Sequence, residues 1–421
     1  MASERLAEWR RHWPVALGAA LVAAAGGSVW PYVMSGFIQP LQTAFGWSRG
    51  DIALALNASL LGALAAPFIG RLADRYSARL VLLLGNILLG LAYIALANNP
   101  GSLAYYYVFY SAMSVAGIAT TSVTYTRAIT SWFDASRGLA LSSTRIGVTI
   151  IVMFLPTVLL TTMSRYGWQA GYYAMAALTW GVSLPFGWFL VKDRRDDPAA
   201  QSVKSGMIGK DGGFAEQLAI LTNWRVLLLS FAIASGYGAM IGILSQLQPM
   251  LVGHGIERSA AAGVVGHMAI STFIAAIVIG FLLDRIWAPL VGFIATLVPV
   301  VGCFLLMSDH VTVQTASIAV ILIGLAVGAE IDIAGYLTAR YFGMKSYGLI
   351  YGVITLVCSL FVAAGGSVSG RLYDIFGGYR EALMVSSALY VLSATSYLLL
   401  GRYPNQAATL EDPIGKPVPA E

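Results

Sequence analysis

The stretch Ile69-Gly70-Arg71-Leu72-Ala73-Asp74-Arg75 has a partial copy 210 residues later, Ile279-Gly280-Phe281-Leu282-Leu283-Asp284-Arg285. Each copy lies between two long apolar runs, and the spacing is half the length of the chain. A charged turn at corresponding places in both halves of an apolar chain indicates a duplicated bundle of membrane helices. In such bundles the functional site lies where the two halves meet.

The composition supports a membrane protein. Hydrophobic residues make up 58% of the chain and charged residues 11%, against about 25% charged residues in soluble domains. The mean hydropathy is +0.74, and a bilayer can accommodate this much apolar surface. The two cysteines, Cys303 and Cys358, both lie inside apolar runs. They predict buried thiols, and their spacing indicates neither a disulfide nor a metal site.

About 20 apolar residues span a bilayer as a helix, and twelve such runs are present. They cover residues 14–41, 51–69, 79–99, 102–132, 137–163, 169–191, 224–252, 258–283, 287–308, 312–341, 346–371 and 379–401. The first run continues past Trp30, so we interpret it as a membrane helix and not as a cleaved signal peptide. Pro31 and Pro40 predict kinks in it.

The basic residues predict the orientation. Of the 25 Lys and Arg residues, Arg127 and Arg145 lie inside predicted spans. With the N-terminus in the cytoplasm, eighteen others are cytoplasmic and five are on the opposite side: Arg49, Arg165, Arg258, Arg371 and Arg380. Both termini are therefore expected inside, in a multi-pass protein of a cell membrane, with a bacterial inner membrane as the expected location.

The predicted domains are an N-terminal six-helix bundle (1–192), a polar cytoplasmic linker (193–223), a C-terminal six-helix bundle (224–402) and a cytoplasmic tail (403–421). No segment is predicted to form a soluble enzyme domain, and no phosphate-binding loop or catalytic triad is visible. We expect a protein that is not an enzyme, without cofactor or bound metal, and monomeric in the bilayer.

Further sequence matches relate the two halves of the chain. Trp132-Phe133 with Gly138 matches Tyr341-Phe342 with Gly348, and Gly167-Trp168 is similar to Gly378-Tyr379. The segment from Gly70 to Arg75, with Arg79 four residues on, resembles the signature loop of the major facilitator superfamily. Ser77 and Leu80 depart from that signature. The resemblance covers nearly the whole chain and implies twelve transmembrane helices in two pseudo-symmetric bundles, with transport by alternating access.

Within the superfamily the chain resembles the monocarboxylate and oxalate–formate branch. Three segments carry this similarity: residues 45–51, residues 132–140 and the turn 370–379. Ser48 and Asp51 in the first segment form a capping-box pattern at a helix start. A basic residue in helix eight or eleven, usual for carboxylate-binding members, is missing from residues 259–284 and 346–370.

The signature implies a gating role for its charged residues. Asp74 can cap a neighbouring helix N-terminus and pair with an arginine when the cytoplasmic side is closed, and Gly70 allows close helix approach. The residues predicted to gate are Gly70, Asp74, Arg75, Arg79, Arg137, Asp284 and Arg285.

Two arginines are predicted inside spans, Arg127 in helix four and Arg145 in helix five. A charge at membrane depth faces a cavity or a partner, and the planar guanidinium suits a carboxylate. We therefore predict that both bind substrate, although either could instead tie helices together through Glu330, Asp332 or backbone carbonyls. Polar residues on helices that line the cavity in the superfamily complete the predicted substrate site: Tyr32, Asn57, Tyr237 and Tyr336.

Helix ten supplies two acids, Glu330 and Asp332, at membrane depth. Residues two apart point about 200° away from each other on a helix, so one is expected to face the cavity and the other a neighbouring helix. Each is a candidate proton carrier or a structural ion-pair partner. His267, in helix eight, is a third candidate for proton coupling, although a packing role is the alternative.

The leading hypothesis is a proton-coupled secondary transporter of a small organic anion, a mono- or dicarboxylate. The alternative is a proton-coupled exporter of drugs or metabolites on the same fold. Exporters usually carry a Gly-Pro-rich motif in helix five and an early arginine in helix four. Residues 143–149 lack that motif, and Met113 occupies the arginine position. A third hypothesis is a membrane sensor that transports nothing. The expected partners are the anion, protons and lipid, with no nucleic acid.

Overall fold

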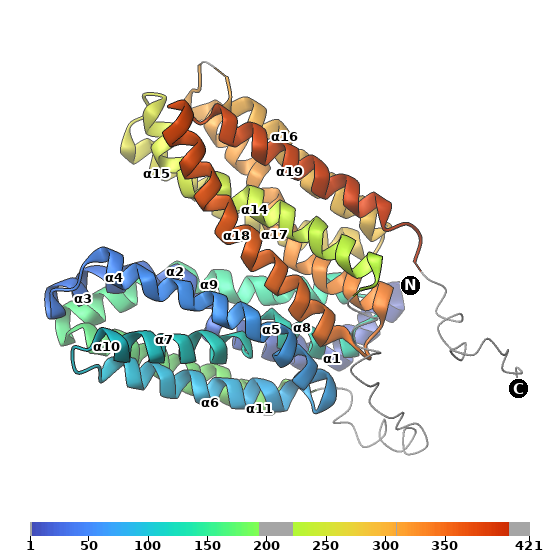
Figure 1. Cartoon of the computed structure of the whole chain (residues 1–421). Helices are drawn as coiled ribbons and strands as arrows, with labels where there is room; N and C mark the ends of the chain where they lie inside the picture. Colours follow the sequence, from blue (N-terminus) through green and yellow to red (C-terminus); the bar gives the residue numbers. More distant parts are fainter. Residues whose placement is uncertain (1, 193–221, 309, 404–421) are drawn as a thin grey trace, which may run out of the picture.

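The computed structural model describes residues 2–192, 222–308 and 310–403, and every regular element within these ranges is a helix. The helices form two lobes that touch at one end and diverge at the other (Figure 1). We call these the closed end and the open end. The predicted linker and tail fall almost entirely outside the described residues.

The first lobe consists of α1 (Ala2–Ala25), η1 (Gly27–Val29), α2 (Trp30–Val33), η2 (Met34–Phe37), α3 (Ile38–Phe45), α4 (Arg49–Leu54), η3 (Ala55–Ala58), α5 (Ser59–Arg75), α6 (Ala78–Ala97), α7 (Leu103–Ile118), α8 (Ser122–Trp132), α9 (Arg137–Tyr166), α10 (Trp168–Leu178), the π-helical η4 (Thr179–Ser183) and α11 (Leu184–Phe189). The second lobe consists of α14 (Trp224–Gly253), α15 (Arg258–Leu283), α16 (Ala288–Leu306), α17 (Val313–Phe342), α18 (Tyr347–Phe376) and α19 (Arg380–Leu399).

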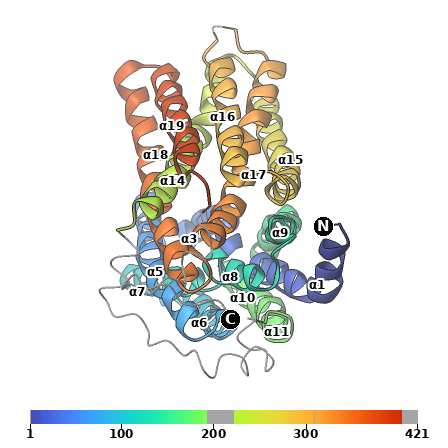
Figure 2. The same cartoon turned by 90° about the vertical axis from the view of Figure 1, so that its right-hand side faces the viewer.

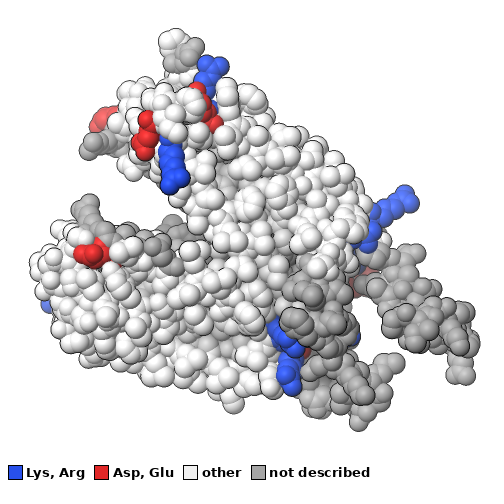
Figure 3. Space-filling view, viewed as in Figure 1, with Lys and Arg blue, Asp and Glu red and all other residues white. Residues whose placement is uncertain are grey.

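Eight helices of the described ranges are long and apolar enough to cross a membrane, or nine if the bent pair at the start of the chain is one span. The twelve predicted runs are consistent with this number, because the remaining three correspond to interrupted helices: α4–α5, α7–α8 and α10–α11. On the face shown in Figure 3, charged side chains lie toward the ends of the lobes and the long flanks are uncharged.

Two spans of the first lobe are broken where they touch each other. The first bends by 50° between Glu4–Ala25 and Gly27–Val33, so a sharp bend falls at Gly26. Kinks at Pro31 and Pro40 stay a prediction. Gly26 is extended, with φ −97° and ψ −157°. The Gly27 N–H donates to Thr120 Oγ1 (2.7 Å), at the break between α7 and α8. This hydrogen bond satisfies a backbone N–H group that the broken helix leaves without an intrahelical partner.

The lobes meet at two helix crossings at the closed end, α5 on α18 and α9 on α15 (Figure 2). At both crossings the backbones of the two helices are in direct contact. A Cβ atom on Gly70 would collide with the carbonyl of Gly348, and one on Gly138 would collide with the carbonyl of Gly280. The two pairs exchange under the 210-residue repeat, so a pseudo-two-fold axis relates the crossings. Glycine allows this approach because it has no side chain.

We predict that Gly348→Ala destabilises the closed arrangement by roughly 1–3 kcal/mol, the usual cost of overpacking. The added methyl group would meet the backbone of Gly70, which cannot move aside as a flexible side chain can. Thermal unfolding of the purified protein measures the effect. Gly366→Ala, on the same helix, is the matched control, because its nearest atoms lie at 3.9 Å. Equal melting temperatures for the two variants would contradict the prediction.

Candidate functional site

At each of the two crossings, an aspartate carboxylate of one lobe binds the N-terminus of a helix of the other lobe. Asp74, in the last turn of α5, accepts hydrogen bonds from the backbone N–H groups of Gly348 and Leu349, both at 2.9 Å. These N–H groups belong to the first turn of α18, where no intrahelical acceptor is available. The negative charge also complements the positive end of the helix dipole. Asp74 of one lobe therefore caps a helix of the other.

The second crossing repeats this arrangement. Asp284 directly follows α15 and accepts hydrogen bonds from the N–H groups of Gly138 (2.7 Å) and Leu139 (3.2 Å), in the first turn of α9. The two aspartates are the corresponding residues of the repeated sequence. The closed end is thus held by two reciprocal helix caps.

Arg127 lies at the first cap and not at a cavity. Its Nη1 is 2.5 Å from Asp74 Oδ1 and donates to the Met344 carbonyl of the other lobe at 3.1 Å. Only 2% of the residue is exposed. In this conformation Arg127 therefore ties the lobes together, which was the alternative weighed for it, although its partner is Asp74 and not an acid of helix ten.

The four basic residues that were predicted to gate each contact residues of their own lobe. Arg75 lies over the Tyr76 ring, Arg79 binds the carbonyl and the ring of Trp188, Arg137 pairs with Asp134 (3.1 Å) and the Phe133 carbonyl, and Arg285 lies over the Phe281 ring. These contacts stabilise the turns that carry the caps. A gating role for them stays a prediction.

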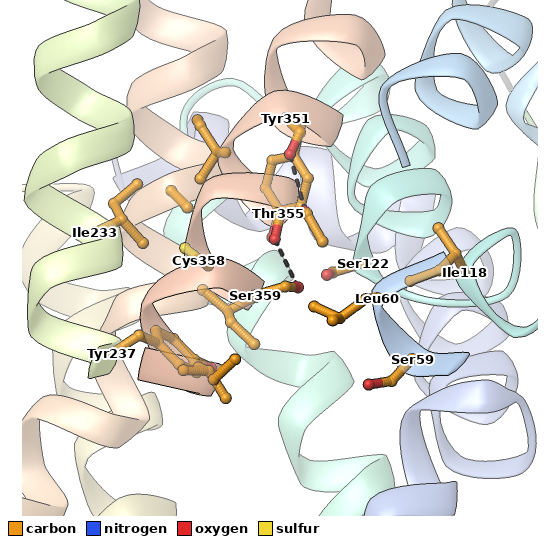
Figure 4. A pocket seen from close by; sticks show the side chains of 15 residues that line it. Ser59, Leu60, Ile118, Ser122, Ile233, Tyr237, Tyr351, Thr355, Cys358 and Ser359 are labelled. Carbon is orange, nitrogen blue, oxygen red and sulfur yellow. Dashed lines mark hydrogen bonds between the residues drawn. The ribbon is translucent and has the colours of Figure 1, made fainter. Parts of the chain in front are cut away.

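A cavity of about 420 Å³ lies between the lobes, beyond the crossings (Figure 4). Its lining includes hydroxyl groups from both lobes and an apolar wall. The lining residues are Ser59, Leu60, Ile118, Ser122, Ile233, Tyr237, Ile331, Ala334, Tyr351, Ile354, Thr355, Cys358, Ser359, Val362 and Ala363. Figure 3 shows a notch between the diverging lobes at the open end.

The first lobe lines this cavity at its helix breaks. Ser59 begins α5, Ile118 ends α7 and Ser122 begins α8. Discontinuous helices are a common way to bring polar backbone to a binding site inside a membrane. The N-terminus of α8 also directs the positive end of its dipole toward the cavity, which favours an anion there.

Arg145 lies beside the cavity. Tyr237, which lines it, lies within electrostatic range of the guanidinium, and the charged neighbours of Arg145 are the carboxyl groups of Asp332 and Glu330. The Nε and Nη2 atoms of Arg145 are buried without a hydrogen-bond partner among the described residues. A guanidinium with donors that are not used by the protein can bind a carboxylate.

The two acids of α17 point in different directions, as the helix geometry predicts. Asp332 accepts a hydrogen bond from Ser142 Oγ of α9 at 2.9 Å, so it faces the other lobe. Glu330 is fully buried and points toward Gly236 of α14. Neither carboxyl oxygen of Glu330 has a hydrogen-bond partner within the described part of the chain.

The remaining predicted residues are dispersed. Tyr32 is 54% exposed and lies within electrostatic range of Arg145. Tyr336 is buried near the closed end, among Arg340, Asp284 and Arg137. His267 is exposed and contacts Ser317 of α17 at 3.2 Å. The side chain of Asn57 lies outside the described residues.

Sequence reasoning missed the hydroxyl groups of the cavity. Tyr351, Thr355 and Ser359 recur every four residues on α18, which places them on one face of the helix. That spacing was a usable signal. Figure 4 shows the hydroxyl groups of Thr355 and Ser359 bonded to backbone carbonyls one turn earlier, at 2.9 Å each. The capping box was predicted correctly, because Ser48 and Asp51 bond each other's backbone N–H groups.

The sequence model described as Major Facilitator Superfamily matches residues 15–366. The chain belongs to this superfamily. Its members are membrane transporters of small molecules, so the predicted family and the all-helical fold are confirmed. In this major facilitator protein, the two capping aspartates, Asp74 and Asp284, follow the second and the eighth predicted spans.

Relatives span most of this transporter. The uncharacterized transporter YhjX of Escherichia coli K12 is 24% identical over 355 residues, 82% of this chain and 85% of the relative. Human monocarboxylate transporter 11 is 23% identical over 350 residues, 80% of this chain and 72% of the relative.

Solved structures share the fold. The major facilitator transporter FucP in its outward conformation has a TM-score of 0.74 at 18% identity, covering 92% of this chain and 99% of FucP. The human organic anion transporter MFSD10 has a TM-score of 0.67 at 16% identity, covering 93% of this chain and 99% of MFSD10.

We predict a pH dependence from Asp284, which lies just beyond the end of α15. Burial raises the pKa of this carboxyl to about 6, and the hydrogen bonds from Gly138 and Leu139 and the charge of Arg5 only partly oppose this. The unfolded value is 3.8. Because the folded form binds the proton more tightly, the stabilisation from protonated Asp284 is complete below about pH 3.8 and is lost as the pH rises through about 6.

The melting temperature should therefore fall more between pH 5 and pH 7 in the wild type than in Asp284→Asn, which cannot titrate at this position. If the melting temperatures of the two proteins changed equally with pH, Asp284 would not contribute to the pH dependence of stability.

Proposed function

We propose that this protein is a proton-coupled secondary transporter of a small organic monoanion, with a monocarboxylate as the natural substrate class. The observation that carries the proposal is Arg145, a half-buried residue beside a cavity between the lobes, whose Nε and Nη2 atoms are buried without a hydrogen-bond partner among the described residues. The relatives add support, since one is named a monocarboxylate transporter and one structure an organic anion transporter.

The closed end is placed in the cytoplasm. The start of α1 and the end of α19 lie at that end (Figure 1), and the excess of basic residues predicted for the cytoplasmic segments lies on the same side. The conformation is then outward-facing, with the cavity reached from outside. Rocking of the lobes would break the two aspartate caps and open the other side.

A monoanion fits better than a dianion. No Lys, Arg, Asp or Glu is among the described residues that line the cavity, so the positive charge comes from Arg145, which lies beside it. Arg127 is held by Asp74, and two acids of α17 lie nearby. A second carboxylate on the substrate would lack a cation and would meet these acids. The apolar wall suits a hydrocarbon body, and the hydroxyl face suits a substrate with polar groups.

Glu330 is assigned to the coupling proton. A fully buried carboxylate without a hydrogen-bond partner among the described residues is costly to keep charged, and the charge of Arg145 only partly offsets this cost, so this group favours carrying a proton while it is buried. Its electrostatic neighbours include Tyr237 and Cys358, which both line the cavity. Asp332 is assigned a different task, which is to hold α17 against Ser142 of α9.

We predict that Arg145→Gln lowers the apparent second-order rate of monocarboxylate uptake by about 10- to 100-fold, the loss expected for a charge-assisted bidentate hydrogen bond. The measurement is uptake of labelled mono- and dicarboxylates into proteoliposomes, with and without an inward proton gradient. Arg165→Gln, an exposed arginine at the other end of α9, is the matched control and should leave uptake unchanged.

Faster uptake of dicarboxylates than of monocarboxylates would contradict the monoanion assignment. If well-folded protein took up none of these acids, the anion proposal would be wrong and the exporter hypothesis would become the leading one. Glu330→Gln should retain exchange of anion for anion while losing gradient-driven uptake. Loss of both activities would contradict its assignment as the proton carrier.

A further inference from the structure

The start of α1 projects past the membrane-spanning part of the helix and lies on the turn between α8 and α9. The Glu8 carboxylate accepts hydrogen bonds from the backbone N–H groups of Asp134 (2.7 Å), Ala135 (3.3 Å) and Ser136 (2.9 Å), and from the Ser136 hydroxyl (2.5 Å). Four hydrogen bonds to one carboxylate fix this segment firmly, because bonds to charged acceptors are the strong ones.

Aromatic contacts add to this anchorage. The ring of Trp9 lies 5.2 Å from that of Phe133, and the ring of His12 lies 4.7 Å from that of Trp132. Residues 2–12, which we call the N-terminal segment, are therefore attached to the first lobe at the point where α9 begins. Figure 2 shows the start of α1 beside α9 at this end.

Arg5 extends from the same segment to the second lobe. It lies three residues before Glu8, about one helical turn away. Its Nη2 donates a hydrogen bond to the backbone carbonyl of Asp284, and its charge acts on the Asp284 carboxylate. That carboxylate caps α9. The N-terminal segment is thus anchored on one lobe by Glu8 and bound to the other by Arg5.

The crossing of α5 and α18 contains a corresponding contact between an arginine and the capping aspartate. There, Arg127 pairs with the capping Asp74 and also donates to the Met344 carbonyl across the lobes. The match of Trp132-Phe133 with Tyr341-Phe342, at an offset of 209 residues, makes Tyr336 the counterpart of Arg127. Tyr336 does lie within electrostatic range of Asp284, but it brings no positive charge. Among the described residues, no arginine of the second half forms an ion pair with Asp284 as Arg127 does with Asp74.

We propose that the N-terminal segment is a latch that completes the second crossing, with Arg5 in the place that Arg127 fills at the first and Glu8 as the residue that positions Arg5. The latch holds the closed end shut and so sets the balance between the two conformations. It rests on the proposed alternating opening of the lobes, but it makes no assumption about the substrate.

The test measures opening of the closed end directly. Leu283 is 1% exposed, and its Cβ lies close to Gly138 in the interface between the lobes. Leu283→Cys, with Cys303 and Cys358 replaced by Ala, reports opening through its rate of reaction with a membrane-impermeant maleimide. Arg5→Ala and Glu8→Gln should each raise that rate by up to about tenfold, the factor that corresponds to about 1.4 kcal/mol.

Two controls make the result specific. Arg10→Ala removes an exposed charge from the same segment and should leave the rate unchanged. Arg5→Lys keeps the charge and should retain most of the protection. If Arg5→Ala and Glu8→Gln both react at the rate of Arg10→Ala, the latch is wrong. If one of these two variants does not fold, the reaction rate of the other variant tests the latch. Absence of anion uptake by the wild type would refute the transport proposal and leave this measurement intact.

Discussion

Contact between bare backbones at two helix crossings is the constraint on which the rest of the structure depends. Gly70 meets Gly348, and Gly138 meets Gly280, without side chains between them. This approach brings the first turn of each long helix within reach of an aspartate from the other lobe. Asp74 and Asp284 can then cap α18 and α9. A larger residue at any of these glycines would separate carboxylate from amide and weaken the cap.

The cavity is a consequence of the same geometry. With the lobes fixed at one end, the broken helices of the first lobe and the hydroxyl face of α18 diverge around a space that opens the other way. The closed end contains strong but breakable contacts, since hydrogen bonds between a carboxylate and a helix N-terminus can be replaced by water when the lobes separate. This suits the alternating opening of the lobes that we propose for this protein.

Much of this followed from the sequence, and the failures have physical reasons. The repeated turn predicted the two aspartates at corresponding places, because both the glycine and the acid are needed for close approach and capping. Arg127 and Arg145 looked equivalent, since sequence gives the depth of a residue in a span but not its partner. Asp74 lies 53 positions before Arg127. Arg5 and Glu8 lie in a short polar stretch without any periodic signal, so only the fold reveals their contacts.

The most direct test is a pair of distance measurements by pulsed electron paramagnetic resonance in a background without Cys303 and Cys358. One spin-label pair, Tyr76→Cys with Ile286→Cys, crosses the closed end, and the other, Tyr166→Cys with Phe376→Cys, crosses the open end; all four positions are exposed. In the Asp74→Asn and Asp284→Asn double variant, the account predicts longer distances across the closed end and shorter ones across the open end. Unchanged distributions for both pairs would contradict it.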